Sequence, residues 1–194
     1  MRIAPIAPRV LLSAYAQGLF PMAMAEGEIG WFSPDPRGII PLDAFHAPAR
    51  LRRVVRQGTF EIHVDRDFEG VMRACAAARA DGTWISEAIV ESYVTLHRLG
   101  FAHSVEAWRD GALAGGLYGL HLGGAFFGES MFHRVTDASK VALVALVDRL
   151  RAGGFTLLDV QWTTEHLEQF GATEISRADY LIRLAEALRQ ECIF

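Results

Sequence analysis

Three polar side chains stand at the ends of two largely apolar stretches and could form a ligand site. Glu129 ends the stretch HLGGAFFGE, while Asp159 and Gln161 lie two residues apart in FTLLDVQ. Residues two apart on a strand face the same side, so Asp159 and Gln161 are expected to project together. A buried carboxylate is strongly destabilising unless it is partnered, and neither stretch places a base beside its acid. A ligand site is therefore favoured over the alternative, a hydrogen-bonded strand cap.

A run of arginines forms a second candidate site. In PARLRRVVRQG, Arg52, Arg53 and Arg56 have the i, i+1 and i+4 spacing that places them on one face of a helix. Like charges on one helix face repel each other unless an anion is bound, so the spacing indicates phosphate binding. The alternative is an ordinary solvated helix face.

Two tryptophans form a third candidate site. Trp31 lies in the proline-rich segment WFSPDPRGIIP, and Trp84 lies in GTWI just before a predicted helix. A tryptophan on a rigid loop can stack on a nucleic-acid base, which contributes about 1–3 kcal/mol. The alternative is that each ring anchors its loop in the core.

Several catalytic templates are absent from the sequence. GESMF at Gly128 lacks the final glycine of a nucleophile elbow, which argues against Ser130 as a hydrolase nucleophile. The seven histidines show no HExxH pair, the two cysteines form no CxxC, and the single lysine does not follow a glycine. We therefore expect no metal, no redox cofactor and no nucleotide hydrolysis.

Length and composition describe an ordinary folded protein that positions these residues. The chain has 194 residues, 51% hydrophobic and 22% charged, with a net charge of -4, which excludes a disordered tail, a coiled coil and a surface that is basic throughout. No apolar stretch is long enough to span a bilayer and no signal peptide is evident, so we expect a cytoplasmic protein without a membrane partner.

Apolar periodicity and turn residues predict the elements. We expect helices over 8–18, 48–57, 67–80, 86–99, 136–151, 163–170 and 178–190, with strands over 59–65 and 155–161 and an antiparallel meander over 102–130. Ser86 is expected to cap the helix over 86–99, and Ser176 to cap the last helix. A strand, a helix of about four turns and a strand predict a crossover with parallel strands. The fold class is therefore α+β, with an amino-terminal domain of residues 1–82 and a catalytic domain of residues 83–194 that contains a mixed sheet.

With these residues assembled, the chain resembles the bacterial leucyl/phenylalanyl-tRNA–protein transferases. The strings that carry the resemblance occur in family order over residues 8–184: GLFPM, WFSPDPRGIIP, GTWI, GGLYG, FGESMF, ASKVALVAL, LLDVQ and HLEQFGATEISRADYL. The resemblance implies an enzyme that transfers Leu or Phe, less often Met, from aminoacyl-tRNA to proteins that begin with Arg or Lys. That transfer marks them for degradation by the N-end rule. It also implies a GNAT-like catalytic domain.

The resemblance assigns roles residue by residue. Asp159 and Gln161 match the catalytic pair, Glu129 matches the essential acid, and Arg52, Arg53 and Arg56 match the tRNA contacts. Trp31 and Trp84 match the aromatic residues that hold the terminal adenosine. The apolar pocket for the donor side chain is expected to be lined by Leu117, Phe126, Met131, Leu143, Leu146, Leu150 and Leu158. The chain departs from the family pattern at Met22, where relatives often have Trp.

Two alternatives remain beside the aminoacyltransferase. One is a tRNA- or protein-binding module that has lost catalysis. The other is an acyl-coenzyme A acetyltransferase, although the usual coenzyme A loop is absent, since RAGGFT fails at Thr156.

Overall fold

The structure, a computed structural model, describes residues 4–24, 28–79 and 82–194. Its strands are β1 (Phe20–Ala23), β2 (Ile29–Phe32), β3 (Arg37–Ile40), β4 (Glu61–Val64), β5 (Ala102–Arg109), β6 (Ala112–Leu122), β7 (Ala125–His133), β8 (Leu157–Gln161) and β9 (Thr173–Ile175). Its helices are α1 (Pro8–Ala16), α2 (Ala49–Arg56), α3 (Phe68–Ala77), α4 (Glu87–Arg98), α5 (Ala138–Ala152), α6 (Glu165–Glu168) and α7 (Arg177–Ala187).

A mixed seven-stranded sheet forms the centre of the molecule, with strand order β4-β5-β6-β7-β8-β3-β9. The pair β7 and β8 is parallel and the other neighbours are antiparallel. Helix α5 connects the two parallel strands, as the spacing of the sequence predicts. The α+β class with a mixed sheet is therefore confirmed.

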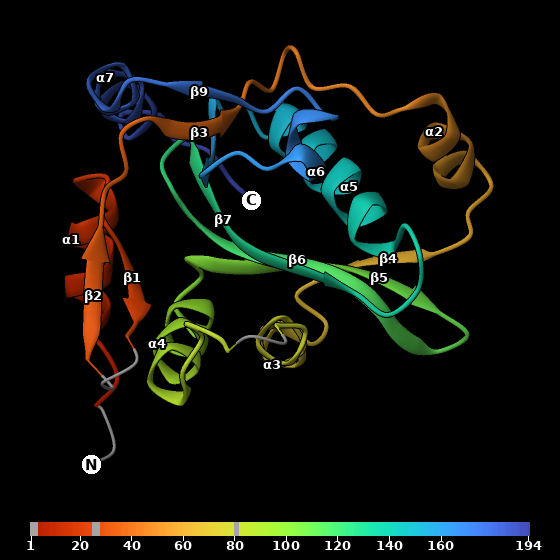
Figure 1. The fold of residues 1–194 in the computed structure, drawn as a ribbon, viewed down its shortest axis with the longest axis horizontal. Helices are drawn as coiled ribbons and strands as arrows, with labels where there is room; N and C mark the ends of the chain where they lie inside the picture. The colour runs from red at the N-terminus through yellow and green to blue at the C-terminus, as the bar shows by residue number, and fades with distance from the viewer. Residues whose placement is uncertain (1–3, 25–27, 80–81) are drawn as a thin grey trace.

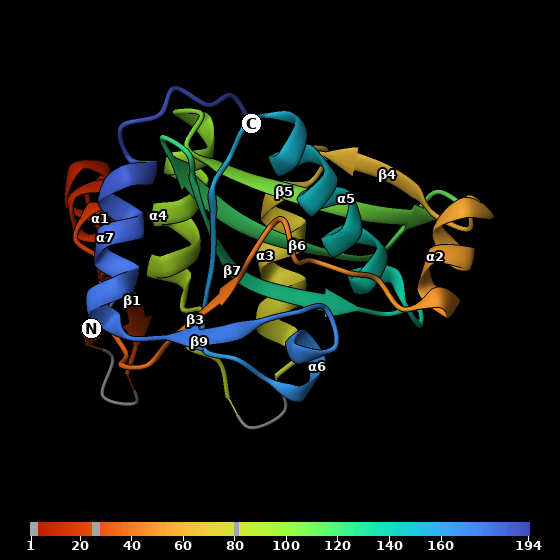
Figure 2. The same ribbon diagram turned by 90° about the horizontal axis from the view of Figure 1, so that it is seen from above.

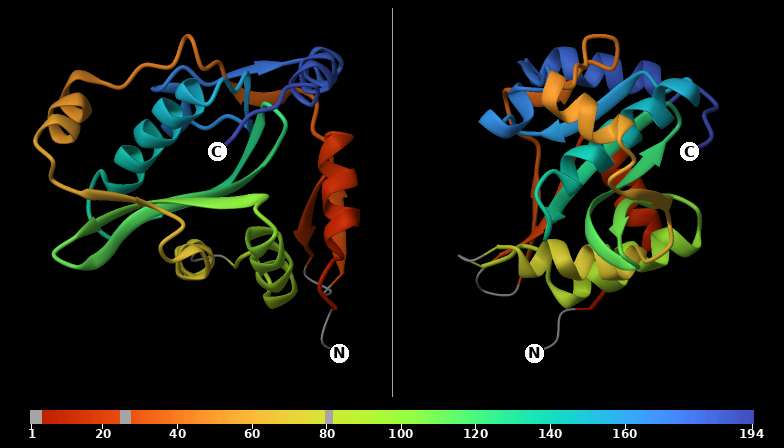
Figure 3. Two further views of the ribbon diagram at one scale, coloured as in Figure 1. Left: turned by 180° about the vertical axis from the view of Figure 1, so that it is seen from behind. Right: turned by 90° about the vertical axis from the view of Figure 1, so that its right-hand side faces the viewer.

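The two faces of this sheet carry separate hydrophobic clusters. Helix α5 covers one face, while α3 and α4 lie against the other (Figure 1). Seen from above, α1 and α7 stand at one end of the molecule and α2 at the opposite end (Figure 2). Figure 3 shows the same order from behind, with β1 and β2 beside α1. The sheet thus separates the α5 side from the side of α1, α3 and α4.

Local sequence signals predict most helix starts correctly. The side chain of Ser86 accepts a hydrogen bond from the Ile89 amide, and Ser176 accepts one from the Asp179 amide. Both are the N-caps that the sequence predicts. Asp137 also stands at the N-cap of α5, but its carboxylate accepts a hydrogen bond from Arg50 Nη2 at 2.6 Å.

Other expected elements differ from the structure. The segment WFSPDPRGIIP, expected to be irregular up to Gly38, contributes to two strands, β2 and β3, because its prolines lie at and between their ends. The short strand β9 was not predicted. Helix α3 ends at Ala77, and its predicted end at Ala80 lies outside the described residues.

The central sheet crosses the boundary expected at residues 82 and 83. Strand β3 pairs with β8 and β9, and strand β4 pairs with β5. Both β3 and β4 precede residue 83, so the two parts of the chain share one hydrogen-bonded sheet. The division into two domains stays a prediction.

Candidate active site

A cavity opens where the two parallel strands diverge. Their pairing runs through Ala125–Leu157 and Phe126–Leu158 and ends at Phe127–Asp159. Strand β7 continues to His133 beyond this last pair, so the sheet forks. The cavity at the fork has a volume of about 400 Å³. Ligand sites commonly lie at the carboxyl ends of parallel strands.

Most of the cavity wall is apolar. Of the residues expected to line the donor pocket, those that do so are Leu117, Met131, Leu143, Leu146 and Leu158. Phe126 and Leu150 lie instead within the core on the α5 side, and neither side chain is exposed. The wall is completed by residues that were not among those expected to line the pocket, including Phe20, Met22, Val160, Trp162 and Leu167.

A β-bulge directs Glu129 into this cavity. Tyr118 of β6 pairs with Ser130 of β7, and the next pair is Gly119 with Gly128, so Glu129 is the extra residue. A bulge of this kind turns two successive side chains toward one face. Accordingly, Glu129 and Ser130 both reach groups on the side of α1 and α3.

A pair of tyrosines holds the Glu129 carboxylate. The Tyr15 hydroxyl of α1 donates to Glu129 Oε1 at 2.6 Å, and a short hydrogen bond links the hydroxyls of Tyr15 and Tyr93. Burial raises the pKa of Glu129 from 4.5 to about 8, outweighing the hydrogen bond from Tyr15, which lowers it. Glu129 is therefore poised to exchange a proton near neutral pH.

The Asp159 carboxylate, by contrast, is enclosed and fully partnered. Arg37 donates through Nε to Oδ1 at 2.9 Å and through Nη2 to Oδ2 at 2.6 Å. The Tyr180 hydroxyl adds a hydrogen bond to Oδ2 at 2.9 Å, and neither side chain of the Arg37–Asp159 pair is exposed. Burial lowers the pKa of Arg37, but the hydrogen bonds that its guanidinium donates to Asp159, together with the charge of that carboxylate, outweigh this and raise the pKa above its ordinary value.

The expectation that Asp159 has no basic partner is therefore wrong. Its partner comes from β3, more than a hundred residues earlier in the chain. The available signal was Arg37 itself, an arginine directly before the apolar run GIIP. An arginine at the start of a buried strand requires a buried acid, because an unpaired internal charge is strongly destabilising.

Gln161 connects Asp159 to the cavity. Its backbone amide donates to Asp159 Oδ1 at 2.9 Å, and its φ of 62° turns the chain at the end of β8. Gly38 permits this close turn, since a Cβ there would lie 2.6 Å from the backbone of Trp162. Among the described residues, Gln161 Nε2 has no hydrogen-bond partner, although it is buried in the cavity wall. An unsatisfied buried donor of this kind suits a ligand oxygen.

The two tryptophans occupy different places. Trp84 lines the cavity, whereas Trp31 lies beside α1 with 39% of its surface exposed and does not line it. Met22 of β1 lines the cavity instead. Met22 is the position at which the family resemblance leads us to expect Trp. The structure therefore brings together Trp84 and Met22, not Trp84 and Trp31.

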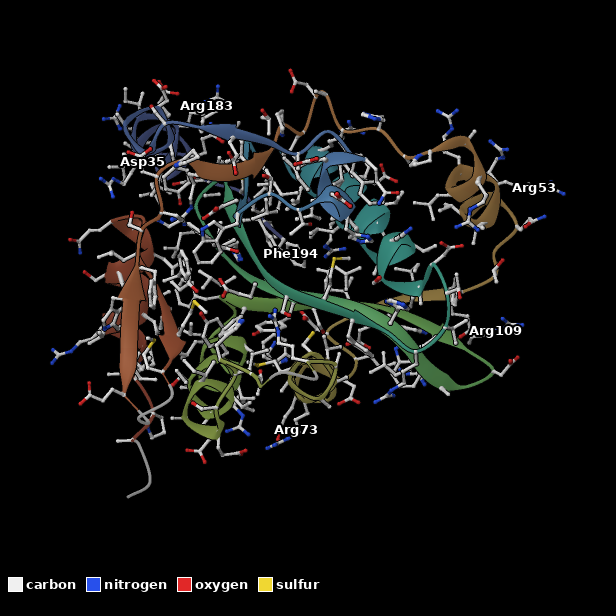
Figure 4. The ribbon with its side chains drawn as sticks, viewed as in Figure 1. Asp35, Arg53, Arg73, Arg109, Arg183 and Phe194 are labelled. Atoms are coloured by element: carbon white, nitrogen blue, oxygen red, sulfur yellow. The ribbon has the colours of Figure 1, made fainter. Side chains whose placement is uncertain are left out.

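The arginine run forms an exposed face on α2. Arg52, Arg53 and Arg56 are solvent-exposed, whereas Arg50 is paired with Asp137. Figure 4 shows Arg53 pointing outward at the end of the molecule away from α1. None of these arginines lines the cavity. Any contact with a substrate there would therefore be remote from the fork.

Two further features of the described residues concern the expected cofactors and partners. Within the described ranges, no group of three or more His, Cys, Asp or Glu side chains could hold a metal ion. In the same part of the chain, no helix combines the length and apolar character needed to cross a membrane.

Comparison with known proteins identifies the family. A family model described as leucyl/phenylalanyl-tRNA protein transferase matches residues 39–185, and the model of its N-terminal domain matches residues 5–35. Leucyl/phenylalanyl-tRNA–protein transferases with high similarity include one from Paramagnetospirillum magneticum, 59% identical over 98% of this chain and 93% of the relative. Another, from Gloeobacter violaceus, is 54% identical over 99% of both chains.

These matches define the protein class as an aminoacyltransferase. The chain belongs to the leucyl/phenylalanyl-tRNA protein transferase family, which confirms the resemblance of its motifs. Its donor is an aminoacyl-tRNA and its acceptor is a protein.

Solved structures show weaker similarity. A GCN5-related N-acetyltransferase from Sphaerobacter thermophilus has a TM-score of 0.47 and 14% identity over 90% of this chain and 55% of that chain. The L-PGS structure from Bacillus licheniformis has a TM-score of 0.47 and 12% identity over 81% of this chain and 66% of that chain. Both scores are below 0.5, so the description of the fold rests on the strand order itself.

Proposed function

We propose that the protein transfers Leu or Phe, less often Met, from aminoacyl-tRNA to proteins whose first residue is Arg or Lys. In this proposal the transfer takes place in the cytoplasm and marks the acceptor for degradation by the N-end rule. Family membership supports the donor class and the reaction. The observation that carries the rest is an apolar cavity of about 400 Å³ with a single acid, Glu129, among the described residues that line it.

The apolar wall suits a branched or aromatic donor side chain. Leu117, Leu143 and Leu158 present only hydrocarbon to the cavity. Hydrophobic pockets distinguish neighbouring side chains weakly, since one methylene contributes about 1–3 kcal/mol. Acceptance of both Leu and Phe follows from such a wall, whereas a charged donor side chain would lose its hydration without a partner.

The chemistry requires a proton acceptor. The amine of the acceptor protein attacks the ester carbonyl, the N–C bond forms, and the bond to the ribose oxygen breaks. The attacking amine must first lose the proton of its ammonium form, and a further N–H proton must reach the departing ribose oxygen. No covalent enzyme intermediate is needed.

Glu129 fits the role of proton acceptor in this reaction. Its pKa of about 8 is close to the usual value for an α-amino group, roughly 7.7–8.0. Proton transfer is most effective between groups of similar pKa, so the exchange requires little free energy. A cationic side chain at the acceptor terminus would also stabilise the ionised Glu129 carboxylate that accepts this proton, which favours acceptors that begin with Arg or Lys.

Asp159 then serves as a positioning residue. The described hydrogen bonds of its carboxylate are with Arg37, Tyr180 and the Gln161 amide, and the side chain is buried and does not line the cavity. Holding the Gln161 backbone directs that side chain into the wall. Gln161 would orient the amine or stabilise the oxygen that becomes negative during attack.

The arginines of α2 are proposed to contact the tRNA outside the cavity. Arg52, Arg53 and Arg56 are exposed and could neutralise phosphates of the acceptor stem. Trp84, in the cavity wall, would stack on the terminal adenine. Trp31 does not line the cavity, so it could contact the tRNA only elsewhere on the protein surface.

A transfer assay tests the proposed function. The protein is incubated with Phe-tRNA and peptides that begin with Arg, Lys or Ala, beside an established transferase as the positive control. We expect transfer to the Arg and Lys peptides and little to the Ala peptide. Absence of transfer to all three would contradict the proposal. Acetyl transfer from acetyl-coenzyme A without RNA would favour the acetyltransferase alternative instead.

A further inference from the structure

Arg79 lies at the mouth of the cavity and is not used by the mechanism above. It follows α3 and lines the cavity together with Trp84 and Ser130. Its Nη2 donates to Ser130 Oγ at 3.2 Å, and its guanidinium carbon lies 5.7 Å from the centre of the Trp84 ring. The side chain is exposed, and the bond to Ser130 uses one of its five N–H donors.

No described carboxylate pairs with Arg79. The contrast with Arg73 on the same helix is direct, because Arg73 pairs with Glu69 and Glu87, both at 2.8 Å. Figure 4 shows Arg73 pointing away from the sheet. A guanidinium at a cavity mouth with a neutral hydroxyl as its only hydrogen-bond acceptor among the described residues is available for an external anion.

The other basic group in the wall is less suited to this task. His166 of α6 lines the cavity, but burial lowers its pKa, and the nearby Lys140 and His133 lower it further. His166 is therefore largely neutral at pH 7. Arg79 is the permanent cation among the described residues that line the cavity.

We propose that Arg79 binds the 5′-phosphate of the terminal nucleotide of the donor tRNA while the adenine of that nucleotide stacks on Trp84. This inference rests on the proposed function, which puts the terminal adenosine at Trp84. A nucleotide carries its phosphate one sugar away from its base, so a cation over the Trp84 ring, 5.7 Å from the ring centre, would be within reach of that phosphate. The planar guanidinium matches the phosphate oxygens with two parallel N–H donors.

The proposal separates two contributions to donor binding. The apolar wall and Trp84 would bind the aminoacyl group and the base, and these contacts are present in any aminoacyl-adenosine. Arg79 would add affinity only for donors that carry the phosphate. The effect should therefore appear mainly in KM for the donor and depend on the donor used.

Two small donors test this separation: 3′-O-phenylalanyl-adenosine and the same ester carrying a 5′-phosphate. Transfer to an Arg peptide is measured for the unmodified protein, Arg79→Ala, Arg79→Lys and the matched control Arg73→Ala. We expect Arg79→Ala to lower kcat/KM about 10- to 100-fold with the phosphorylated donor and to change it little with the adenosine donor. Arg79→Lys should retain part of the preference for the phosphorylated donor, and Arg73→Ala should retain all of that preference.

Three results would overturn the proposal. They are an equal loss with both donors in Arg79→Ala, no loss with either, and equal use of the two donors by the unmodified protein. Thermal unfolding of each variant shows whether an equal loss of kcat/KM with both donors comes from misfolding. If Arg79→Ala is misfolded, the comparison of the two donors is made with Arg79→Lys instead. Failure of the unmodified protein to transfer from intact Phe-tRNA would instead contradict the proposed function, so the two failures are distinguishable.

Discussion

Two carboxylates lie at the fork between β7 and β8, and they differ in the groups that surround them. Asp159 accepts hydrogen bonds from Arg37, Tyr180 and a backbone amide, and none of its side chain is exposed. Glu129 stands on a bulge at the cavity wall, and burial there raises its pKa to about 8. An acid whose charge is neutralised by an arginine can stabilise the fold. An acid that accepts hydrogen bonds but has no cation beside it can exchange a proton.

This difference arises from backbone geometry as much as from residue type. Asp159 has a partner on both neighbouring strands, Phe127 of β7 and Ile39 of β3, and its side chain faces elements that supply donors. Glu129 has no cross-strand partner, because Tyr118 pairs with Ser130 and Gly119 with Gly128. One inserted residue therefore turns a side chain of β7 into the cavity.

The largest expected effect is the loss of catalysis in Glu129→Gln. The amide has nearly the same shape but cannot accept the proton, so kcat should fall about 10²- to 10⁴-fold. Single-turnover transfer from Phe-tRNA to an Arg peptide measures this, with the exposed Glu69→Gln as control. A kcat equal to that of the unmodified protein would remove Glu129 from the chemistry.

Arg37→Met should have the largest effect on stability. It leaves Asp159 buried without its ion-pair partner, a change that typically costs about 3–5 kcal/mol. Urea unfolding followed by circular dichroism gives the free energy of unfolding, and Arg73→Met, which breaks an exposed ion pair, serves as the control. Equal stability of the two variants would contradict the burial of the Arg37–Asp159 ion pair.

The raised pKa of Glu129 also predicts a pH dependence of stability. Because folding raises this pKa from 4.5 to about 8, the folded protein keeps a proton that the unfolded chain releases between these values. Stability from this group is therefore fully present below about pH 4.5 and is lost as pH rises toward 8, by up to about 1.4 kcal/mol per pH unit. Unfolding of Glu129→Gln should lack this contribution. Parallel pH curves for the two proteins would contradict the shift.

A smaller effect is expected at the apolar wall. Met131→Ala enlarges the cavity without removing a polar contact, so the ratio of Phe to Leu transfer should change by about 1–3 kcal/mol, roughly 5- to 150-fold. Competition between Phe-tRNA and Leu-tRNA measures the ratio. Phe126→Leu, which changes the neighbouring core but not the cavity wall, is the control. An unaltered ratio would place the donor side chain elsewhere.

The smallest effect concerns the exposed arginines of α2. Combined Arg52→Ala and Arg53→Ala should weaken tRNA binding and reduce the slope of log affinity against log salt by about one for each lost phosphate contact. Filter binding at several salt concentrations gives the slope, and Arg98→Ala on α4 is the control. An unchanged slope would assign these arginines to a solvated helix face.

The sequence predicts the parts of this comparison that depend on local rules. The caps Ser86 and Ser176 and the helix α5 between parallel strands follow from spacing. Spacing also places Asp159 and Gln161 on one face of a strand, but of these two residues only Gln161 lines the cavity. The resemblance to the family names Glu129 and five residues of the apolar wall, and the structure places all six in the wall of the cavity.

The remaining features depend on contacts between distant segments. Arg37 meets Asp159 only after β3 has joined β8, and Tyr15 reaches Glu129 from α1. The bulge at Glu129 depends on the register between β6 and β7, which hydrophobic alternation does not specify. Likewise, the exchange of Trp31 for Met22 in the cavity wall follows from how β1 and β2 pair.

The most direct test of the central claim is the titration of the Glu129 carboxyl by ¹³C NMR. The spectrum of protein labelled at glutamate side-chain carboxyls is followed from pH 4 to 10, and comparison with Glu129→Gln assigns the signal. We expect this carbon to titrate with a pKa of about 8, well above the other glutamates. A midpoint near 4.5, the ordinary value for a glutamate, would show that the Glu129 carboxylate is a much weaker base than the attacking amine and would contradict the matched proton transfer on which its role depends.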